Sequence, residues 1–121
     1  MKILIVDDDK DIVQLLEIYV RNEGYEPITA YNGKEALTKL NTNPDISLVI
    51  LDIMMPEMDG MEVIKQVRKD SSIPILVVSA KTTDMDKIQG LITGADDYVT
   101  KPFNPLELVA RVKSQLRRYV R

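Results

Sequence analysis

Carboxylates and other polar side chains follow four apolar segments of this 121-residue chain, and they are the residues best suited to chemistry. Asp7 and Asp8 follow the first apolar run, Asp52 follows a second, Ser79 ends a third, and Lys101 comes shortly after a fourth. Clustered carboxylates repel one another unless a cation is present, and an all-oxygen site with few protein ligands suits Mg²⁺. An aspartate can also accept a phosphoryl group covalently. The pattern predicts phosphoryl transfer to Asp52, with the lysine and the hydroxyl completing an anion pocket.

Each of these residues also has an ordinary structural interpretation. An acidic cluster between a strand and a helix often only caps the helix, which is the role expected of Asp9. Taken alone, Asp7 and Asp8 leave both interpretations open. Taken singly, Ser79 would be a strand-end hydroxyl, Lys101 a solvated charge and Asp52 a turn-forming carboxylate. Because the carboxyl ends of parallel strands meet at one edge of a sheet, the convergence of all five favours a functional site.

Short apolar runs alternate with segments of helical periodicity, a pattern typical of a parallel sheet with helices on both faces. The chain therefore belongs to the α/β class, and we expect five strands and five helices. The expected strands are Ile3–Val6, Pro27–Ala30, Leu48–Leu51, Ile73–Ser79 and Asp97–Val99. The expected helical segments are Ile12–Val20, Gly33–Leu40, Met61–Val67, Asp84–Thr93 and Asn104–Tyr119.

Composition indicates one compact domain over residues 1–121, with 45% hydrophobic and 29% charged residues and a net charge of −3. Such a mildly acidic chain lacks the broad positive field of a nucleic-acid-binding protein. The absence of cysteine and histidine excludes disulfides, thiolate chemistry and the usual zinc ligands. No apolar run is long enough for a signal peptide or a membrane span, so we expect a cytoplasmic protein.

Four separated blocks carry a specific resemblance to a known family. They are Ile3–Asp9, Leu51–Pro56 with Met58–Gly60, Ser79–Lys81, and Gly94–Tyr98 with Thr100–Phe103. In this order they resemble the receiver domains of bacterial two-component response regulators, over the whole chain. The resemblance implies a flavodoxin-like (βα)5 fold, with a five-stranded parallel sheet in the order 2-1-3-4-5 and helices on both faces.

The resemblance also implies roles for the acidic residues. Asp52 would be the phosphoacceptor, and the donor would be a sensor histidine kinase. Asp8 and Asp52 would bind Mg²⁺ directly and Asp7 would bind it through water, while the Met54 backbone carbonyl would supply a further ligand. Met54 and Lys81 flank the expected path of the hydrolytic water, and neither is an obvious water-activating group. We therefore expect a long-lived phosphoryl group and only slow autodephosphorylation.

The remaining pocket residues are implied to form a switch. Ser79 and Lys101 would hold the phosphoryl oxygens, and the Lys101–Pro102 peptide would be cis. After phosphorylation Ser79 would move toward the new charged group, and Tyr98 would rotate into the space behind the fourth strand. Without the resemblance, Tyr98 would be read as a half-exposed strand tyrosine.

The segment 87–118 is similar to the OmpR/PhoB-type subfamily, whose active receivers form homodimers through the fourth helix, the fifth strand and the fifth helix. The implied interchain ion pairs are Lys87 with Glu107, Asp97 with Arg111, and Asp96 with Arg118. The implied apolar centre is Ile88, Leu91 and Val109. Exposed ion pairs contribute about 1 kcal/mol or less each, so the apolar centre would have to carry the binding. The alternative is an ordinary solvated surface.

Members of this subfamily usually continue into a DNA-binding domain, so DNA would be contacted only by a separate domain outside this chain. The parent protein would then be a transcription regulator, and the segments 105–111 and 116–119 look closest to vancomycin-resistance-type regulators. A stand-alone receiver remains the alternative domain organisation.

Two other functional classes fit less well. A magnesium-dependent phosphatase or phosphotransferase would place an acid–base aspartate two residues after the acceptor, where this chain has Met54, and would need a substrate cap. A flavin carrier would need a phosphate loop rich in glycine and hydroxyls after the first strand, where this chain is acidic. We therefore expect a signalling domain rather than an enzyme.

Overall fold

The structure, a computed structural model, describes residues 1–80 and 94–119. Within these residues, five parallel strands form one sheet in the order β2-β1-β3-β4-β5, which confirms the predicted topology. The strands are β1 (Lys2–Val6), β2 (Glu26–Ala30), β3 (Ile46–Leu51), β4 (Ile75–Ser79) and β5 (Asp97–Thr100). Their registers pair Val6 with Leu51 and Ser79 with Thr100. The carboxyl ends of β1, β3, β4 and β5 therefore meet at one edge of the sheet.

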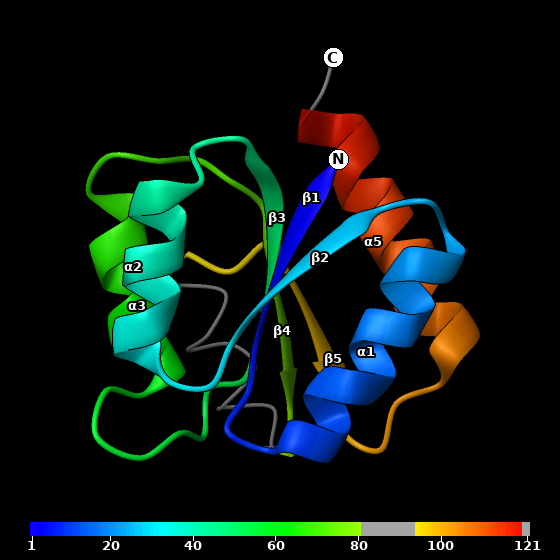
Figure 1. Cartoon of the computed structure of the whole chain (residues 1–121), viewed down its shortest axis with the longest axis horizontal. Helices are drawn as coiled ribbons and strands as arrows, with labels where there is room; N and C mark the ends of the chain where they lie inside the picture. Colours follow the sequence, from blue (N-terminus) through cyan, green and yellow to red (C-terminus); the bar gives the residue numbers. More distant parts are fainter. Residues whose placement is uncertain (81–93, 120–121) are drawn as a thin grey trace.

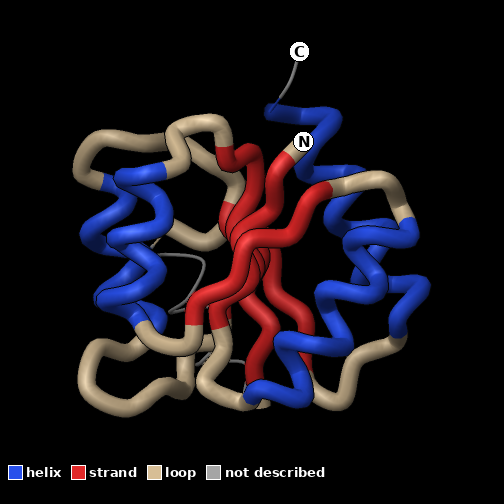
Figure 2. Tube along the Cα trace, viewed as in Figure 1, coloured by secondary structure: helices blue, strands red, loops and turns tan. Residues whose placement is uncertain are grey.

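Helices cover both faces of the sheet (Figures 1 and 2). The described helices are α1 (Lys10–Asn22), α2 (Gly33–Thr42), α3 (Gly60–Arg68) and α5 (Pro105–Tyr119). Helices α2 and α3 lie on one face, and α1 and α5 lie on the other (Figure 1). The helix expected at Asp84–Thr93 falls outside the described residues. No helix within residues 1–80 and 94–119 has the length and apolarity needed to cross a membrane.

Two apolar layers hold the helices to the sheet, because successive strand residues point to opposite faces. Leu4 and Val6 of β1 pack in the layer that contains Val63 and Val67 of α3. The alternate residues of the strands pack with α1 and α5 in the second layer. Both faces of the central strands are thus buried, which explains why these strands read as continuous apolar runs.

Side-chain caps fix where the helices begin. The Asp9 carboxylate accepts hydrogen bonds from the Asp11 and Ile12 N–H groups, so the capping role expected of Asp9 is confirmed. The side chains of Asn32 and Asp59 accept from N–H groups in the first turns of α2 and α3. Asn104 does the same for α5, which therefore begins one residue later than predicted.

The start of the fourth strand was predicted two residues too early. The ladder of β4 begins at Ile75 rather than Ile73. Pro74 has no N–H to donate to a neighbouring strand, although its carbonyl still accepts from Val49 N–H at 3.0 Å. Beyond the end of β5, the Lys101–Pro102 peptide is cis, as the resemblance implied.

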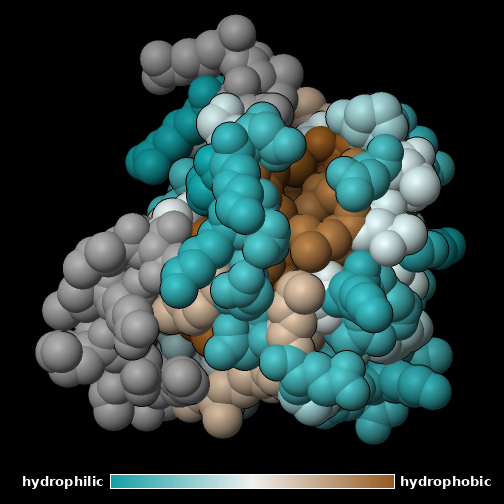
Figure 3. Space-filling model, turned by 90° about the vertical axis from the view of Figure 1, so that its left-hand side faces the viewer, coloured by the Kyte–Doolittle hydropathy of each residue, from teal (hydrophilic) through white to brown (hydrophobic). Residues whose placement is uncertain are grey.

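The face formed by α2 and α3 carries an apolar hollow, which Figure 3 shows between hydrophilic side chains. Its apolar lining comes from the middle and the last turns of α2, from the last turn of α3, and from residues at or just before the amino ends of β3 and β4. These residues are Leu37, Leu40, Ile46, Val67 and Ile73. The hollow lies at the opposite end of the sheet from the acidic residues.

Candidate functional site

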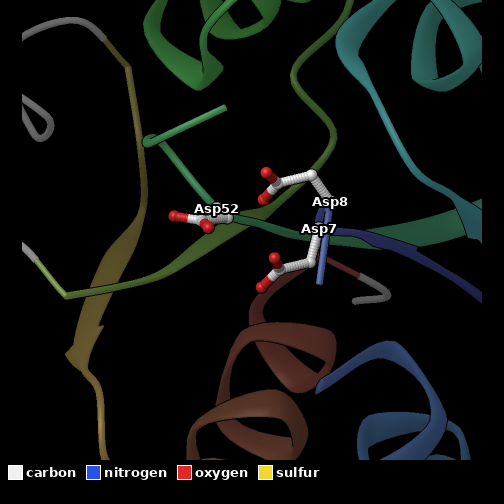
Figure 4. A group of neighbouring side chains, drawn as sticks. All are labelled: Asp7, Asp8 and Asp52. Atoms are coloured by element: carbon white, nitrogen blue, oxygen red, sulfur yellow. The ribbon is translucent and has the colours of Figure 1, made fainter. Parts of the chain in front are cut away.

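Three carboxylates converge at the carboxyl edge of the sheet (Figure 4). Asp7 and Asp8 follow β1, and Asp52 follows the adjacent strand β3. One oxygen from each carboxylate lies within 4.8 Å of the other two. Asp7 is 2% exposed and Asp52 is 5% exposed, whereas Asp8 is exposed to solvent. The predicted cluster is therefore formed, with two buried charges and one that faces solvent.

Lys101 lies between the two buried carboxylates. Its Nζ atom is 2.7 Å from Asp7 Oδ2 and 3.2 Å from Asp52 Oδ2. The Lys101 N–H donates to the Ser79 carbonyl at 2.9 Å, which ties the base of this side chain to the end of β4. Lys101 follows the edge strand β5, whereas the carboxylates follow β1 and β3, so its side chain reaches the acidic cluster across the end of β4. This is the convergence that the sequence predicted.

Burial dominates the electrostatics of Asp7. It raises the pKa of Asp7 from the ordinary value of 3.8 to about 6, and the nearby charge of Asp52 acts in the same direction. Hydrogen bonds from Lys101 and from the Asp9 N–H oppose this rise in pKa. Among the residues that the structure describes, the site holds three carboxylates and one ammonium group, which leaves an excess of negative charge that a bound cation can offset.

The pKa of Lys101 moves in the direction that keeps it charged. Burial alone would lower its pKa, but the hydrogen bond to Asp7 and the charges of Asp52 and Asp7 outweigh burial and raise it. Lys101 is therefore a fixed cation beside Asp52.

The donor set fits Mg²⁺. All three side chains offer carboxylate oxygens, and the exposure of Asp8 leaves one side open for water or a phosphate group. The Met54 N–H donates to Asp52 Oδ1 at 3.0 Å and so fixes the orientation of the acceptor carboxylate. The role of the Met54 carbonyl as a metal ligand stays a prediction.

The two predicted switch residues lie on neighbouring strands. Ser79 is the fully buried last residue of β4, and Tyr98 lies on β5 opposite Val77. Tyr98 is partly buried and packs against the apolar layer on the α2–α3 side of the sheet. The strand pairing brings Ser79 to the same edge as Asp52, but the movement of either residue remains a prediction.

Ion pairs within one chain occupy several residues of the predicted dimer face. Arg111 Nη1 is 2.6 Å from Asp97 Oδ1, and Arg111 Nε is 3.2 Å from Glu107 Oε1. An interchain pair between Asp97 and Arg111 would have to replace or share this contact. Val109 is partly buried and Arg118 is exposed. Lys81, Lys87, Ile88 and Leu91 lie outside the described residues.

Sequence reasoning missed the role of Arg68 at the end of α3. Its guanidinium donates to the Gly94 carbonyl at 3.0 Å, to the Ile73 carbonyl at 2.6 Å and to Asp96 Oδ2 at 2.8 Å. Asp96 Oδ2 also accepts from the Ile75 N–H. The pairing predicted for Asp96 was with Arg118 of a second chain, whereas in this chain Asp96 binds Arg68. A basic residue in the last turn of a helix is common, so the sequence carried no signal for this contact.

Comparison with known proteins identifies the family, because the family described as "Response regulator receiver domain" matches residues 3–113. The chain belongs to this family. The predicted family is thus confirmed, and the receiver domain is similar to the regulatory protein VanRc of Enterococcus gallinarum. The two are 50% identical over 120 residues, which cover 99% of this chain and 52% of VanRc.

Further similarities agree with this assignment. The receiver domain is 51% identical to the regulatory protein VanR of Enterococcus faecium over 118 residues, which cover 98% of this chain and 51% of VanR. The chain thus spans about half the length of these curated relatives. Among solved structures, the receiver domain of the Francisella response regulator 1452 matches with a TM-score of 0.91 and 40% identity. That match covers 97% of each chain.

Proposed function

We propose that this receiver domain accepts a phosphoryl group on Asp52 from a sensor histidine kinase, with Mg²⁺ held by Asp7, Asp8 and Asp52. The observation that carries the proposal is the position of Lys101, whose ammonium group lies 3.2 Å from the Asp52 carboxylate inside a cluster of three acidic groups. A charged lysine at an acceptor carboxylate is suited to hold the oxygens of the incoming phosphoryl group.

The proposed step forms a bond between one Asp52 carboxylate oxygen and phosphorus. The bond between phosphorus and the donor breaks, and the electron pair leaves with the donor group. The Met54 N–H holds Asp52 Oδ1 during the approach, and Lys101 is close enough to move from the carboxylate to a phosphoryl oxygen. Mg²⁺, when bound, would offset the negative charge of the transferring group. We propose no further turnover, so this domain acts as an acceptor and not as an enzyme.

The phosphoryl group is proposed to act as a switch through Ser79 and Tyr98. A new doubly charged group near the end of β4 offers the Ser79 hydroxyl a strong acceptor, and Tyr98 on the adjacent strand follows it inward. The consequence would be a homodimer formed by the predicted fourth helix together with β5 and α5. The basis of this proposal is the resemblance of the segment 87–118 to the OmpR/PhoB-type subfamily. Arg111 contacts Asp97 and Glu107 within one chain, so dimer formation would require it to exchange or share these contacts.

An attached domain is proposed from the lengths of the relatives. Since the named regulatory proteins are about twice as long as this chain, we propose that the domain controls an attached DNA-binding domain in the cytoplasm. A stand-alone receiver is the alternative. A phosphotransferase is disfavoured, because the side chain two residues after Asp52 is the thioether of Met54, which cannot serve as an acid or a base.

Intact-mass measurement after incubation with acetyl phosphate tests the acceptor. The native chain should gain one phosphoryl group in the presence of Mg²⁺ and none in the presence of a chelator. Asp52→Asn should gain none. Asp59→Asn is the matched control, because this exposed carboxylate only caps α3 and its loss should leave the adduct unchanged. An adduct of equal yield on Asp52→Asn would refute the assignment.

A further inference from the structure

We propose that Gly60, the first residue of α3, is a positioning residue for the phosphoacceptor. Its lack of a side chain lets the start of α3 rest directly on the backbone that carries Asp52. The inference rests on the proposed function, since it assigns to Gly60 the placement of the carboxylate that accepts the phosphoryl group.

The contact is with main-chain atoms. A Cβ atom on Gly60 would lie 2.5 Å from the Asp52 carbonyl oxygen and 2.6 Å from Ile53 Cα. It would also lie 3.0 Å from the Asp52 carbonyl carbon. Real Cβ atoms do not approach other heavy atoms this closely, and backbone cannot rotate out of the way as a flexible side chain can. A methyl group at position 60 therefore has to displace the Asp52–Ile53 peptide or α3 itself.

Hydrogen bonds transmit such a displacement into the site. The Ile53 carbonyl accepts from Gly60 N–H at 2.9 Å and from Met55 N–H at 3.0 Å. The intervening Met54 N–H holds Asp52 Oδ1 at 3.0 Å. A shift of Ile53 thus changes both the direction of the Asp52 side chain and the hydrogen bond that orients its carboxylate. Asp7, Asp8 and Lys101 come from other segments and would keep their places.

Backbone conformation does not by itself require glycine at this position. Gly60 is not among the residues with positive φ, and it lies in a helix, where alanine is the better helix former. By contrast, Gly24 has φ +85° and no atom within 4 Å of an added Cβ. A lower phosphorylation rate or a weaker Mg²⁺ affinity in Gly60→Ala would therefore result from the close approach to Asp52. It would not result from a poor helix-forming residue.

The expected effect falls on acceptance of the phosphoryl group more than on the fold. Misplacing a reacting group by about 1 Å can cost about 100-fold in rate. We expect Gly60→Ala to lower the rate of phosphorylation by acetyl phosphate by about tenfold or more. We also expect it to weaken Mg²⁺ binding, measured by titration calorimetry, because Asp52 is one of the three proposed ligands.

A variant in the same helix separates positioning from general destabilisation. Val67→Ala creates a cavity near the other end of α3, where Val67 is 6% exposed and part of the apolar layer. Urea unfolding should show that both variants lose stability. Only Gly60→Ala should lose the phosphorylation rate and the Mg²⁺ affinity, while Val67→Ala stays within about twofold of the native chain in both, as expected for a distant independent site.

Two results would overturn the proposal. One is a folded Gly60→Ala chain that is phosphorylated and binds Mg²⁺ as Val67→Ala does. The other is a Gly60→Ala chain that stays unfolded even in concentrated sucrose, which stabilises compact states, since Gly60 would then serve the fold alone. If the native chain takes up no phosphoryl group, the proposed function fails. Mg²⁺ affinity then still decides whether Gly60 positions Asp52.

Discussion

Replacing Asp7 by asparagine should make the metal-free protein more stable at neutral pH. Asp7 is buried, its pKa is raised to about 6, and it shares one lysine with Asp52. Two buried carboxylates and one ammonium group leave a net negative charge in a region of low dielectric constant. The Asp7→Asn substitution would remove that excess and leave Lys101 with Asp52 as a one-to-one pair. The same substitution should weaken Mg²⁺ binding.

The size of the expected stabilisation by Asp7→Asn follows from the pKa of Asp7. A carboxyl whose pKa rises from 3.8 to about 6 on folding costs the folded state up to about 3 kcal/mol at neutral pH. An amide has one acceptor oxygen for two donors, Lys101 and the Asp9 N–H, so about 1 kcal/mol of hydrogen bonding is lost. The expected net gain in the free energy of unfolding is on the order of 1–2 kcal/mol.

The dependence on pH has a definite sign. Because the pKa of Asp7 is higher in the folded state, the folded chain binds this proton more readily, and the contribution of Asp7 to the free energy of unfolding falls as the pH rises from about 4 through about 6. The Asp7→Asn chain undergoes no such loss, because an amide does not titrate in this range. The difference in the free energy of unfolding between Asp7→Asn and the native chain should therefore be small below about pH 4 and reach its full size above about pH 6.

Urea unfolding in the presence of a chelator, at a series of pH values, measures this gap. The expected shift of the midpoint at pH 7 is on the order of 0.5–1 M. Asp8→Asn is the matched control and should gain less, because the Asp8 carboxylate is exposed to solvent. A destabilised Asp7→Asn chain at pH 7 would refute the electrostatic reasoning. So would a gap of equal size at pH 4 and pH 7.

Individual contacts and the proposed metal site give four further predictions. Lys101→Met should lower the urea midpoint at pH 7, because two buried carboxylates lose their cation. Asp9→Ala should cost about 1 kcal/mol in the same assay through loss of the α1 cap. Leu106→Gln should change stability by less than about 0.5 kcal/mol, since Leu106 is 82% exposed. Mg²⁺ at 100 times its dissociation constant should stabilise the native chain by about 2.7 kcal/mol in thermal unfolding, and Asp52→Asn much less.

The sheet and the acidic cluster could be predicted because their signals are local. Strands buried on both faces give continuous apolar runs, and the polar residue that ends each run marks the carboxyl edge of the sheet. Asp7 and Asp52 are examples, and both lie where the sequence placed them. The order of the strands came from the family blocks, since periodicity does not tell which strands are neighbours.

Contacts between distant segments could not be predicted in the same way. The resemblance placed Lys101 at the phosphoryl group, but its bridge between Asp7 and Asp52 depends on how the cluster is charged without a metal ion. Gly60 belongs to one of the family blocks, but its close approach to the backbone of Asp52 was not predicted, because a glycine at the start of a helix is usually interpreted only as the end of a loop. The early boundary of the fourth strand came from reading Ile73 as part of the apolar run across Pro74.

The most direct test of the central claim is to map the phosphorylated residue. An aspartyl phosphate is an acyl phosphate, which borohydride reduces to the alcohol, so homoserine marks the acceptor in a peptide map. After treatment with acetyl phosphate and Mg²⁺, we predict homoserine at position 52 and at no other aspartate, and none when Mg²⁺ is chelated. Homoserine at Asp7 or Asp8, or an equal yield at position 52 without Mg²⁺, would contradict the account.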